Sequence, residues 1–325
     1  MFAGLFRSNR PAILLVLVVL VPALFWPTLS RTPWSGHGSM PLFGLLQRAV
    51  GDSSWANGAL GLALTVLIAA QLAYLVNARE LMQRRNHLPA LFFVLVLAAL
   101  GKGPLLIPAL AGMPFVLLAL HRAWSMNNMG SALAPLFDAG SLLGVAALFY
   151  LPYAFLVVVL WGSTSVIRPF HWRDHVVPVV GCSIAFFLAW ACLRLAGATP
   201  WHPFYTLMNF GGSTGLLLDL APQRIFLYLV LSGMLLVGAV AFARAYATGV
   251  MREKNLRSSF LSLCAALGVV VASGWLLDHT APAVLVAVPF AVFTAYAVQH
   301  GRRPLLGEFT VLALVLLAVW GQWGR

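Results

Sequence analysis

The chain has 325 residues, of which 61% are hydrophobic and 9% are charged, and its formal net charge is +12. Soluble domains carry about 25% charged residues, so this composition excludes a soluble, nuclear or secreted protein and predicts an all-α polytopic membrane protein. A transmembrane β-barrel is excluded because its strands alternate in hydropathy, whereas the apolar runs here are continuous. The basic residues cluster between those runs, which indicates orientation in a membrane rather than nucleic-acid binding.

Seven apolar runs are close to the length of about 20 residues that a spanning helix needs. They cover 11–30, 58–76, 175–195, 225–246, 259–277, 283–299 and 305–322. The first run follows two arginines and is longer than the apolar core of a secretory signal, so it predicts a retained signal-anchor helix.

Two further apolar regions, 88–121 and 138–166, are too long for one straight span and are interrupted by GKGP (101–104) and YLPY (150–153). Each is therefore predicted to form a hairpin of two short helices. The chain then has about eleven helical segments in one integral membrane domain, 1–325, with its N-terminus inside and its C-terminus outside. This threading puts fourteen of the twenty lysine and arginine residues on the inner side, and a single span at 138–166 would abolish that bias.

The stretch IRPFHWRDHVVPVVG (167–181) is the densest polar motif. The threading places it at the inner membrane surface, where it is predicted to be a polar collar made of Arg168, His171, Arg173, Asp174 and His175. Pro169 ends the preceding helix, and Asp174 is suited to cap the next one. The alternative is a functional site, including a metal site on His171 and His175, although the sequence offers no third ligand.

Two external loops, 31–57 and 196–224, are long enough to fold over the outer surface. Within the first, MPLFGLLQRAV (40–50) has apolar residues at helical spacing and predicts an amphipathic surface helix. Asp52 follows in the motif GDSS, where it is either the N-cap of the next helix or the acidic residue of an external active site.

The external loops supply most of the polar groups on that side. Asp52 is the candidate general base or anchor for a divalent cation, and His37 or His202 would assist it. A basic residue beside an acid suits a phosphate-bearing lipid. The candidate substrate-binding residues are Arg48, Tyr205, Asp219 and Arg224. No cofactor motif is evident, and a divalent cation is left open.

Several isolated polar residues have local interpretations. Asp138 is predicted to cap the second hairpin, and Lys102 is predicted to reach the surface from the tip of the first. Glu308 lies one turn into the last segment, within reach of Arg302 or Arg303. Small buried apolar positions are expected for the three cysteines, Cys182, Cys192 and Cys264.

Three stretches in order, 88–126, 136–161 and 167–188, resemble a family of multi-spanning inner-membrane proteins of unknown function from Bacteroidetes. The resemblance is carried by LFDAGSLLGVAALFY (136–150) followed by RPFHWR (168–173). It implies a multi-pass protein of the bacterial inner membrane, and it implies no reaction.

The long first external loop, followed by paired short helices, is similar to the C-type (GT-C) glycosyltransferases. Those membrane enzymes use polyprenyl-phosphate-linked sugars at the outer face. The resemblance implies an acidic catalytic residue in the first external loop, where Asp52 is the only acid.

Three hypotheses for function therefore stay open. The first is a GT-C-like transferase of cell-envelope biogenesis that acts on a polyprenyl-phosphate-linked sugar. The second is a non-catalytic membrane subunit or assembly factor of a larger complex, which the scarcity of buried acids favours. The third is a transporter, which the two interrupted hairpins favour. Membrane lipids are expected partners in each case, and nucleic acid is not.

Overall fold

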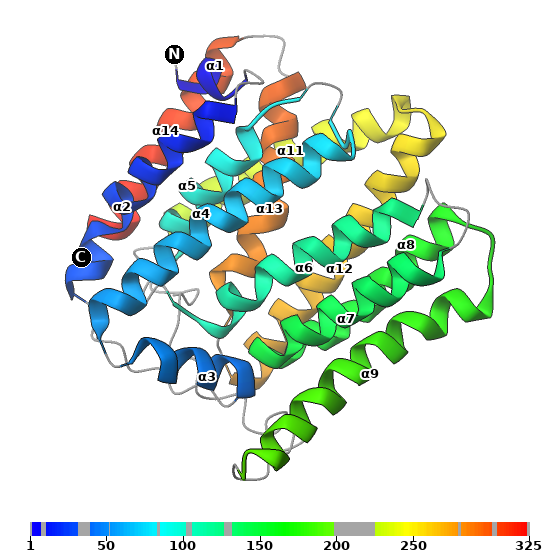
Figure 1. Cartoon of the computed structure of the whole chain (residues 1–325). Coiled ribbons are helices and arrows are strands. Elements are labelled where there is room, and N and C mark those ends of the chain that lie inside the picture. The colour runs from blue at the N-terminus through cyan, green and yellow to red at the C-terminus, as the bar shows by residue number, and fades with distance from the viewer. Residues whose placement is uncertain are drawn as a thin grey trace.

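The computed structural model describes residues 2–7, 11–31, 40–51, 53–82, 85–101, 106–126, 132–197, 225–278, 281–300 and 304–323. Within these residues the chain forms thirteen α-helices and two 3₁₀ helices, so the predicted all-α bundle is confirmed (Figure 1). The elements are α1 (Phe2–Phe6), η1 (Pro11–Ile13), α2 (Leu14–Arg31), α3 (Pro41–Val50), α4 (Ser54–Ala78), α5 (Leu88–Leu100), α6 (Pro108–Ser125), α7 (Leu133–Phe149), η3 (Leu151–Leu156), α8 (Val157–Ile167), α9 (Trp172–Leu195), α11 (Ile225–Thr248), α12 (Met251–Asp278), α13 (Ala283–His300) and α14 (Pro304–Trp323).

Four helices in the described part of the chain are long and apolar enough to cross a membrane by themselves. They are Ser54–Ala78, Trp172–Leu195, Ile225–Thr248 and Met251–Leu276. The remaining apolar helices are shorter, and α5 is the extreme case because all of its residues are buried. A helix that is apolar all round belongs in the interior of a bundle, and α5 packs between α4, α13 and α14.

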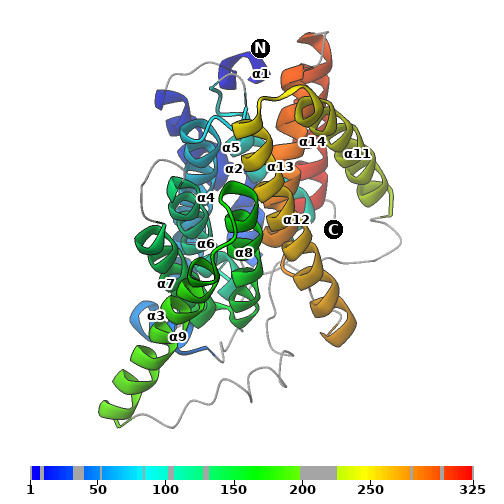
Figure 2. The same cartoon turned by 90° about the vertical axis from the view of Figure 1, so that its right-hand side faces the viewer.

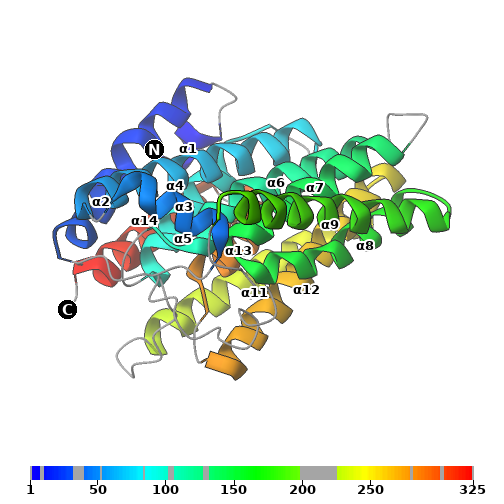
Figure 3. The ribbon, with the colours of Figure 1, turned by 60° about the horizontal axis from the view of Figure 1, so that its bottom comes forward.

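Each of the two long apolar regions forms two helices rather than one. The first divides into α5 and α6, and the second divides into α7 and the η3–α8 segment. The N-terminal part of α7 and the C-terminal part of α8 both contact the start of α9, so α7 and α8 run antiparallel. Tyr153 in η3 donates a hydrogen bond to the carbonyl oxygen of Ala109 in α6. Figure 3 shows α6, α7 and α9 along one flank of the bundle.

Glycines allow the closest helix contacts of this flank. A Cβ atom on Gly140 in α7 would lie 2.1 Å from the carbonyl oxygen of Pro178 in α9. A Cβ atom on Gly181 would lie 2.6 Å from the carbonyl oxygen of Phe137. Since such distances exclude any side chain, the backbones of α7 and α9 meet directly over this stretch.

At one end of the bundle, which we call the basic end, hydrogen bonds and ion pairs of arginine side chains connect the ends of neighbouring helices. Arg122 at the close of α6 pairs with Asp138 near the start of α7 at 3.0 Å. Arg257 in α12 donates to the carbonyl oxygen of Ala245 in α11 at 2.6 Å, and it also contacts the backbone of Leu81, just after α4. The opposite end, the α3 end, holds α3 and the far end of α9 (Figure 2).

Several local predictions need correction. Helix α12 begins at Met251, eight residues earlier than expected, so Arg252, Lys254 and Arg257 lie in a helix rather than in a loop. Helix α7 begins at Leu133, and Asp138 therefore pairs with Arg122 instead of capping the helix. Of the three cysteines predicted to be buried, Cys182 is buried, Cys264 is half-buried and Cys192 is exposed.

Candidate functional site: an apolar groove at the α3 end

Most of the polar residues predicted for an external site lie outside the described residues. These are His37, Asp52, His202, Tyr205, Asp219 and Arg224. Lys102 lies outside them as well. Arg48 is the described member of the set, and it is exposed near the end of α3.

The amphipathic helix predicted at 40–50 is present as α3. Pro41 starts it, and Phe43 is buried in a small cluster with Met40, Leu106, Ala111 and Leu151. Leu106 precedes α6 and Leu151 begins η3, so α3 covers the ends of two neighbouring elements. Gly51, with φ of 74°, ends the helix in a conformation that favours glycine.

The cap of α4 is Ser53 rather than Asp52. Its side-chain oxygen accepts a hydrogen bond from the backbone N–H of Ala56 at 3.4 Å. Asp52 itself lies outside the described residues, so its role as the acid of an external site stays a prediction.

An apolar groove of about 710 Å³ lies between α3, α7 and α9, and we call it the outer groove because the threading expected from the sequence puts the α3 end outside. Side chains of Pro41, Leu42 and Leu45 line it from α3. The other lining residues are Phe137, Ser141, Val145, Leu148, Ile184, Ala185, Leu188, Ala189, Cys192, Leu193 and Ala196. The Ser141 hydroxyl donates to the carbonyl oxygen of Phe137 in its own helix. The groove is therefore chemically suited to a hydrocarbon chain.

The rim of the outer groove carries a cation. Helical spacing puts Arg48 seven residues after Pro41 and three after Leu45, on the face of α3 that lines the groove. A guanidinium at the edge of an apolar channel is well placed for a phosphate whose hydrocarbon tail lies inside.

The predicted collar residues lie at the basic end, where they join α8 to α9. The indole N–H of Trp161 donates to the carbonyl oxygen of His175 at 2.8 Å. Ser165 Oγ lies 3.1 Å from His175 Nε2, and His175 Nδ1 lies 3.1 Å from the carbonyl oxygen of His171. These contacts orient the imidazole ring of His175 and fix the corner between the two helices.

The remaining collar residues differ in exposure. The guanidinium of Arg173 lies 5.7 Å from the ring centre of Trp172, and both residues are exposed. His171, which makes no capping hydrogen bond, occupies the N-cap position of α9 that Asp174 was expected to take. Asp174 is buried in the first turn of α9, where a negative charge interacts favourably with the helix dipole. Arg168 occupies the C-cap position of α8.

In the part of the chain that the structure describes, no third ligand joins His171 and His175 to form a metal site. No group of three metal-ligating side chains occurs among these residues. Comparison of the chain with protein-family models, curated proteins and solved structures yields no match.

The outer groove itself was missed by reasoning from the sequence, because its three walls are far apart along the chain. One signal was present. Gly140, Gly144 and Gly181 are spaced so that α7 and α9 can approach closely, and larger residues such as Leu188 follow where the groove opens.

Proposed function

We propose that this protein is a multi-pass inner-membrane protein of cell-envelope biogenesis that binds a polyprenyl-phosphate-linked sugar at its outer end. The isoprenoid chain lies in the outer groove, and Arg48 binds the phosphate. The observation that carries the proposal is this large apolar groove beside an exposed cation on a surface helix.

The proposal uses a threading of eleven membrane segments: α2, α4, α5, α6, α7, η3–α8, α9, α11, α12, α13 and α14. The clustering of Arg79, Arg122, Arg168 and Arg257 toward the basic end supports an inner location for that end. The α3 end, with the outer groove, then lies on the outer side.

Short segments are compatible with this threading. Helix α5 has 13 residues and rises about 20 Å, less than the hydrocarbon thickness of about 30 Å. Because α5 is buried among other helices, protein rather than lipid surrounds its ends, and irregular backbone is tolerated there.

Chain connectivity supports a catalytic role for the external loops. Asp52 follows the last residue of α3 by two positions, and the loop that carries His202 begins just after α9. Both loops thus start at walls of the outer groove. In a GT-C-like transfer, Asp52 would accept the proton of the attacking acceptor hydroxyl or hold a divalent cation, and His37 or His202 would assist. Tyr205, Asp219 and Arg224 would complete the substrate site.

A second candidate function is a non-catalytic subunit of a membrane complex. Its support is the exposure of α9 and α11, two of the longest apolar helices, of which most residues are not buried. Exposed examples are Phe187 and Trp190 on α9 and Phe226 on α11. Such faces fit a partner helix as well as lipid.

Site-specific photo-crosslinking tests the substrate proposal. A benzophenone amino acid would replace Leu188 in the outer groove or, as a control, Leu236, an exposed residue of α11. The full chain in nanodiscs would be irradiated with a polyprenyl phosphate. We expect an adduct at position 188 that excess unlabelled polyprenyl phosphate suppresses and phospholipid does not. Equal labelling at both positions would contradict the proposal.

Catalysis is tested separately from binding. The Asp52→Asn variant should keep the position-188 adduct and lose sugar transfer from the lipid donor. Retention of sugar transfer in Asp52→Asn would show that Asp52 is not the catalytic acid, whereas an adduct without any transfer by the unaltered chain would favour the second candidate.

A further inference from the structure

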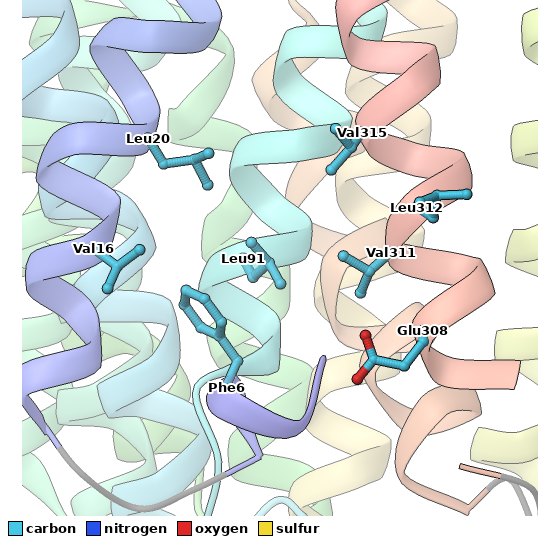
Figure 4. A pocket seen from close by; sticks show the side chains of 8 residues that line it. All are labelled: Phe6, Val16, Leu20, Leu91, Glu308, Val311, Leu312 and Val315. Carbon is cyan, nitrogen blue, oxygen red and sulfur yellow. The ribbon is translucent and has the colours of Figure 1, made fainter. Parts of the chain in front are cut away.

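A second groove, of about 420 Å³, lies between α2 and α14, with α5 as its floor (Figure 4). Its lining is apolar except for the Glu308 carboxylate, and Glu308 Oε1 already accepts a hydrogen bond from the backbone N–H of Gly4 at 3.2 Å. A surface of this kind does not distinguish one hydrocarbon chain from another. The basic end differs, because its arginines include donors that have no acceptor among the described residues.

Arg79 follows α4 and connects it to the end of α6. Its Nη2 atom donates to the carbonyl oxygen of His121 at 2.8 Å and lies 3.4 Å from His121 Nε2. The other guanidinium nitrogens, Nη1 and Nε, have no acceptor within the described part of the chain, and Nε is enclosed. Most donors of this charged group are therefore unused.

His121 adds a second enclosed donor. A guanidinium nitrogen can only donate, so His121 Nε2 accepts from Arg79 and the imidazole proton is on Nδ1. His121 Nδ1 has no hydrogen-bond partner in the parts of the chain that the structure describes. Tyr74 lies against the imidazole, with 5.2 Å between the ring centres. Enclosed donors that lack a protein acceptor are found where a protein holds an ion or a water molecule.

A second arginine approaches from α12. Arg257 donates to the backbone carbonyl of Leu81, which places the start of α12 beside the segment that follows Arg79. Arg252 lies in the first turn of α12, is exposed, and forms no ion pair with a described acid. Burial lowers the pKa of Arg79, Tyr74 acts in the opposite direction, and the positive charge of Arg252 lowers it further. Two positive charges are thus close together at this corner.

The described acids nearby do not neutralise these two arginines. Asp138 pairs with Arg122 at 3.0 Å, and Glu253 pairs with Arg257 at 3.0 Å. Glu80 is exposed after α4 and forms no ion pair with a described residue. Orientation in the membrane requires that arginines lie on the inner side, but it does not require two of them to lie together beside enclosed donors.

We propose that Arg79 and Arg252 bind the phosphate group of a phosphomonoester, whose charge is about −1.5 to −2 at neutral pH. Guanidinium groups bind phosphate oxygens through parallel N–H···O hydrogen bonds, and two guanidinium groups match the charge of this anion. A phosphodiester carries a single negative charge and would leave one arginine uncompensated. Phosphomonoesters occur as lipid headgroups, as in phosphatidic acid, and as soluble esters, and the experiment separates these two sources.

The test is phosphate binding to the full chain in phosphatidylcholine nanodiscs. Glycerol 3-phosphate, compared with sodium chloride at equal ionic strength, reports on a soluble source through the thermal unfolding midpoint. Phosphatidic acid and phosphatidylglycerol with identical acyl chains, compared by native mass spectrometry, report on a lipid source. We expect a higher midpoint with glycerol 3-phosphate, about tenfold stronger retention of phosphatidic acid than of phosphatidylglycerol, or both. Either effect supports the proposal and identifies the source, and the absence of both would overturn it.

Variants locate the phosphate. Arg252→Gln should weaken the observed binding about tenfold without loss of stability, because Arg252 is exposed. Arg79→Lys keeps the charge without the paired donors and should weaken binding as well. Arg173→Gln, at an exposed position of the basic end, and Arg48→Gln, on α3, should leave binding unchanged. Unchanged binding in Arg252→Gln would contradict the site, and loss of binding in Arg48→Gln would move the phosphate to the outer groove and overturn the proposal.

Discussion

Tyr153 Oη donates a hydrogen bond of 2.6 Å to the carbonyl oxygen of Ala109, and this bond joins the turn of the α7–α8 pair to the first turn of α6. The Tyr153 ring also fills the space beside Gly112, where a Cβ atom would be 2.8 Å from a ring carbon. Two interrupted regions, far apart in sequence, are thereby held together at the α3 end. The contact stabilises the wall on which α3 and the outer groove rest.

Removal of the Tyr153 hydroxyl should therefore weaken the bundle. Tyr153→Phe leaves the carbonyl group of Ala109 without this donor, and we expect a loss of about 1 kcal/mol in the free energy of unfolding. Steric trapping or denaturant unfolding in bicelles would measure it. Tyr74→Phe is the control, because Tyr74 is exposed. Equal stability of the two variants would show that the hydrogen bond contributes little.

Because the backbones of α7 and α9 are in direct contact, a single methyl group added between them should lower the stability of the protein. In Gly140→Ala, the new Cβ atom would overlap the carbonyl group of Pro178, so the helices must separate at a cost of about 1–3 kcal/mol. Gly268→Ala in α12 is the matched control, because no described atom beyond the backbone of its own helix turn lies within 4 Å of its added Cβ. Thermal unfolding in detergent should show a lower midpoint for Gly140→Ala alone. A lower midpoint for both would indicate a general effect of helix glycines.

Replacement of buried Arg257 should reduce stability more than replacement of an exposed arginine on the same helix. Its side chain is fully buried, donates to Ala245 and lies 3.0 Å from the Glu253 carboxylate. Arg257→Lys cannot reproduce the several donors of a guanidinium and should cost about 2–4 kcal/mol. Arg252→Lys, at an exposed position in the first turn of the same helix, should be neutral. Thermal stability of the two purified variants decides this, and similar losses would contradict the structural role of Arg257.

His87 predicts a loss of stability in acid. Its side chain is 7% exposed, and neither ring nitrogen has a hydrogen-bond partner among the residues that the structure describes. Burial lowers the pKa of His87 below its ordinary value, so the unfolded chain takes up the proton first. The free energy of unfolding should therefore be fully present at neutral pH and should fall as the pH drops below about 6.5.

Replacement of the imidazole checks the assignment. His87→Phe should flatten the decrease in unfolding midpoint between neutral pH and mild acid, and His171→Phe, at an exposed position, should not. An unaltered acid response in His87→Phe would show that another group is responsible.

The sequence predicts the helices well because their signals are local. GKGP and YLPY divide two apolar regions, and the structure has separate helices on either side of each motif. The start of α12 was missed because Arg252, Glu253 and Lys254 reduce the hydropathy there. Those residues are nevertheless helical, and Leu256 and Phe260 continue the buried face.

The candidate sites could be predicted only in part. The amphipathic pattern of 40–50 indicates α3 and places Arg48 on it. The outer groove, however, combines Leu45, Val145 and Leu188 from three helices, and no spacing along the chain relates such residues. The same holds for Gly4 and Glu308, which lie near opposite ends of the sequence and meet only when α1 packs on α14.

The central claim is that the α3 end, with the outer groove, faces outward. Labelling of single cysteines tests it directly, in a chain whose Cys182, Cys192 and Cys264 are replaced by alanine. Ser53→Cys and Ser165→Cys would report on the two ends, because both positions are exposed. A membrane-impermeant thiol reagent would be applied to cells with a permeabilised outer membrane. We expect labelling at position 53 and, at position 165, none until the inner membrane is lysed. Labelling at position 165 but not at position 53 in intact cells would contradict the account.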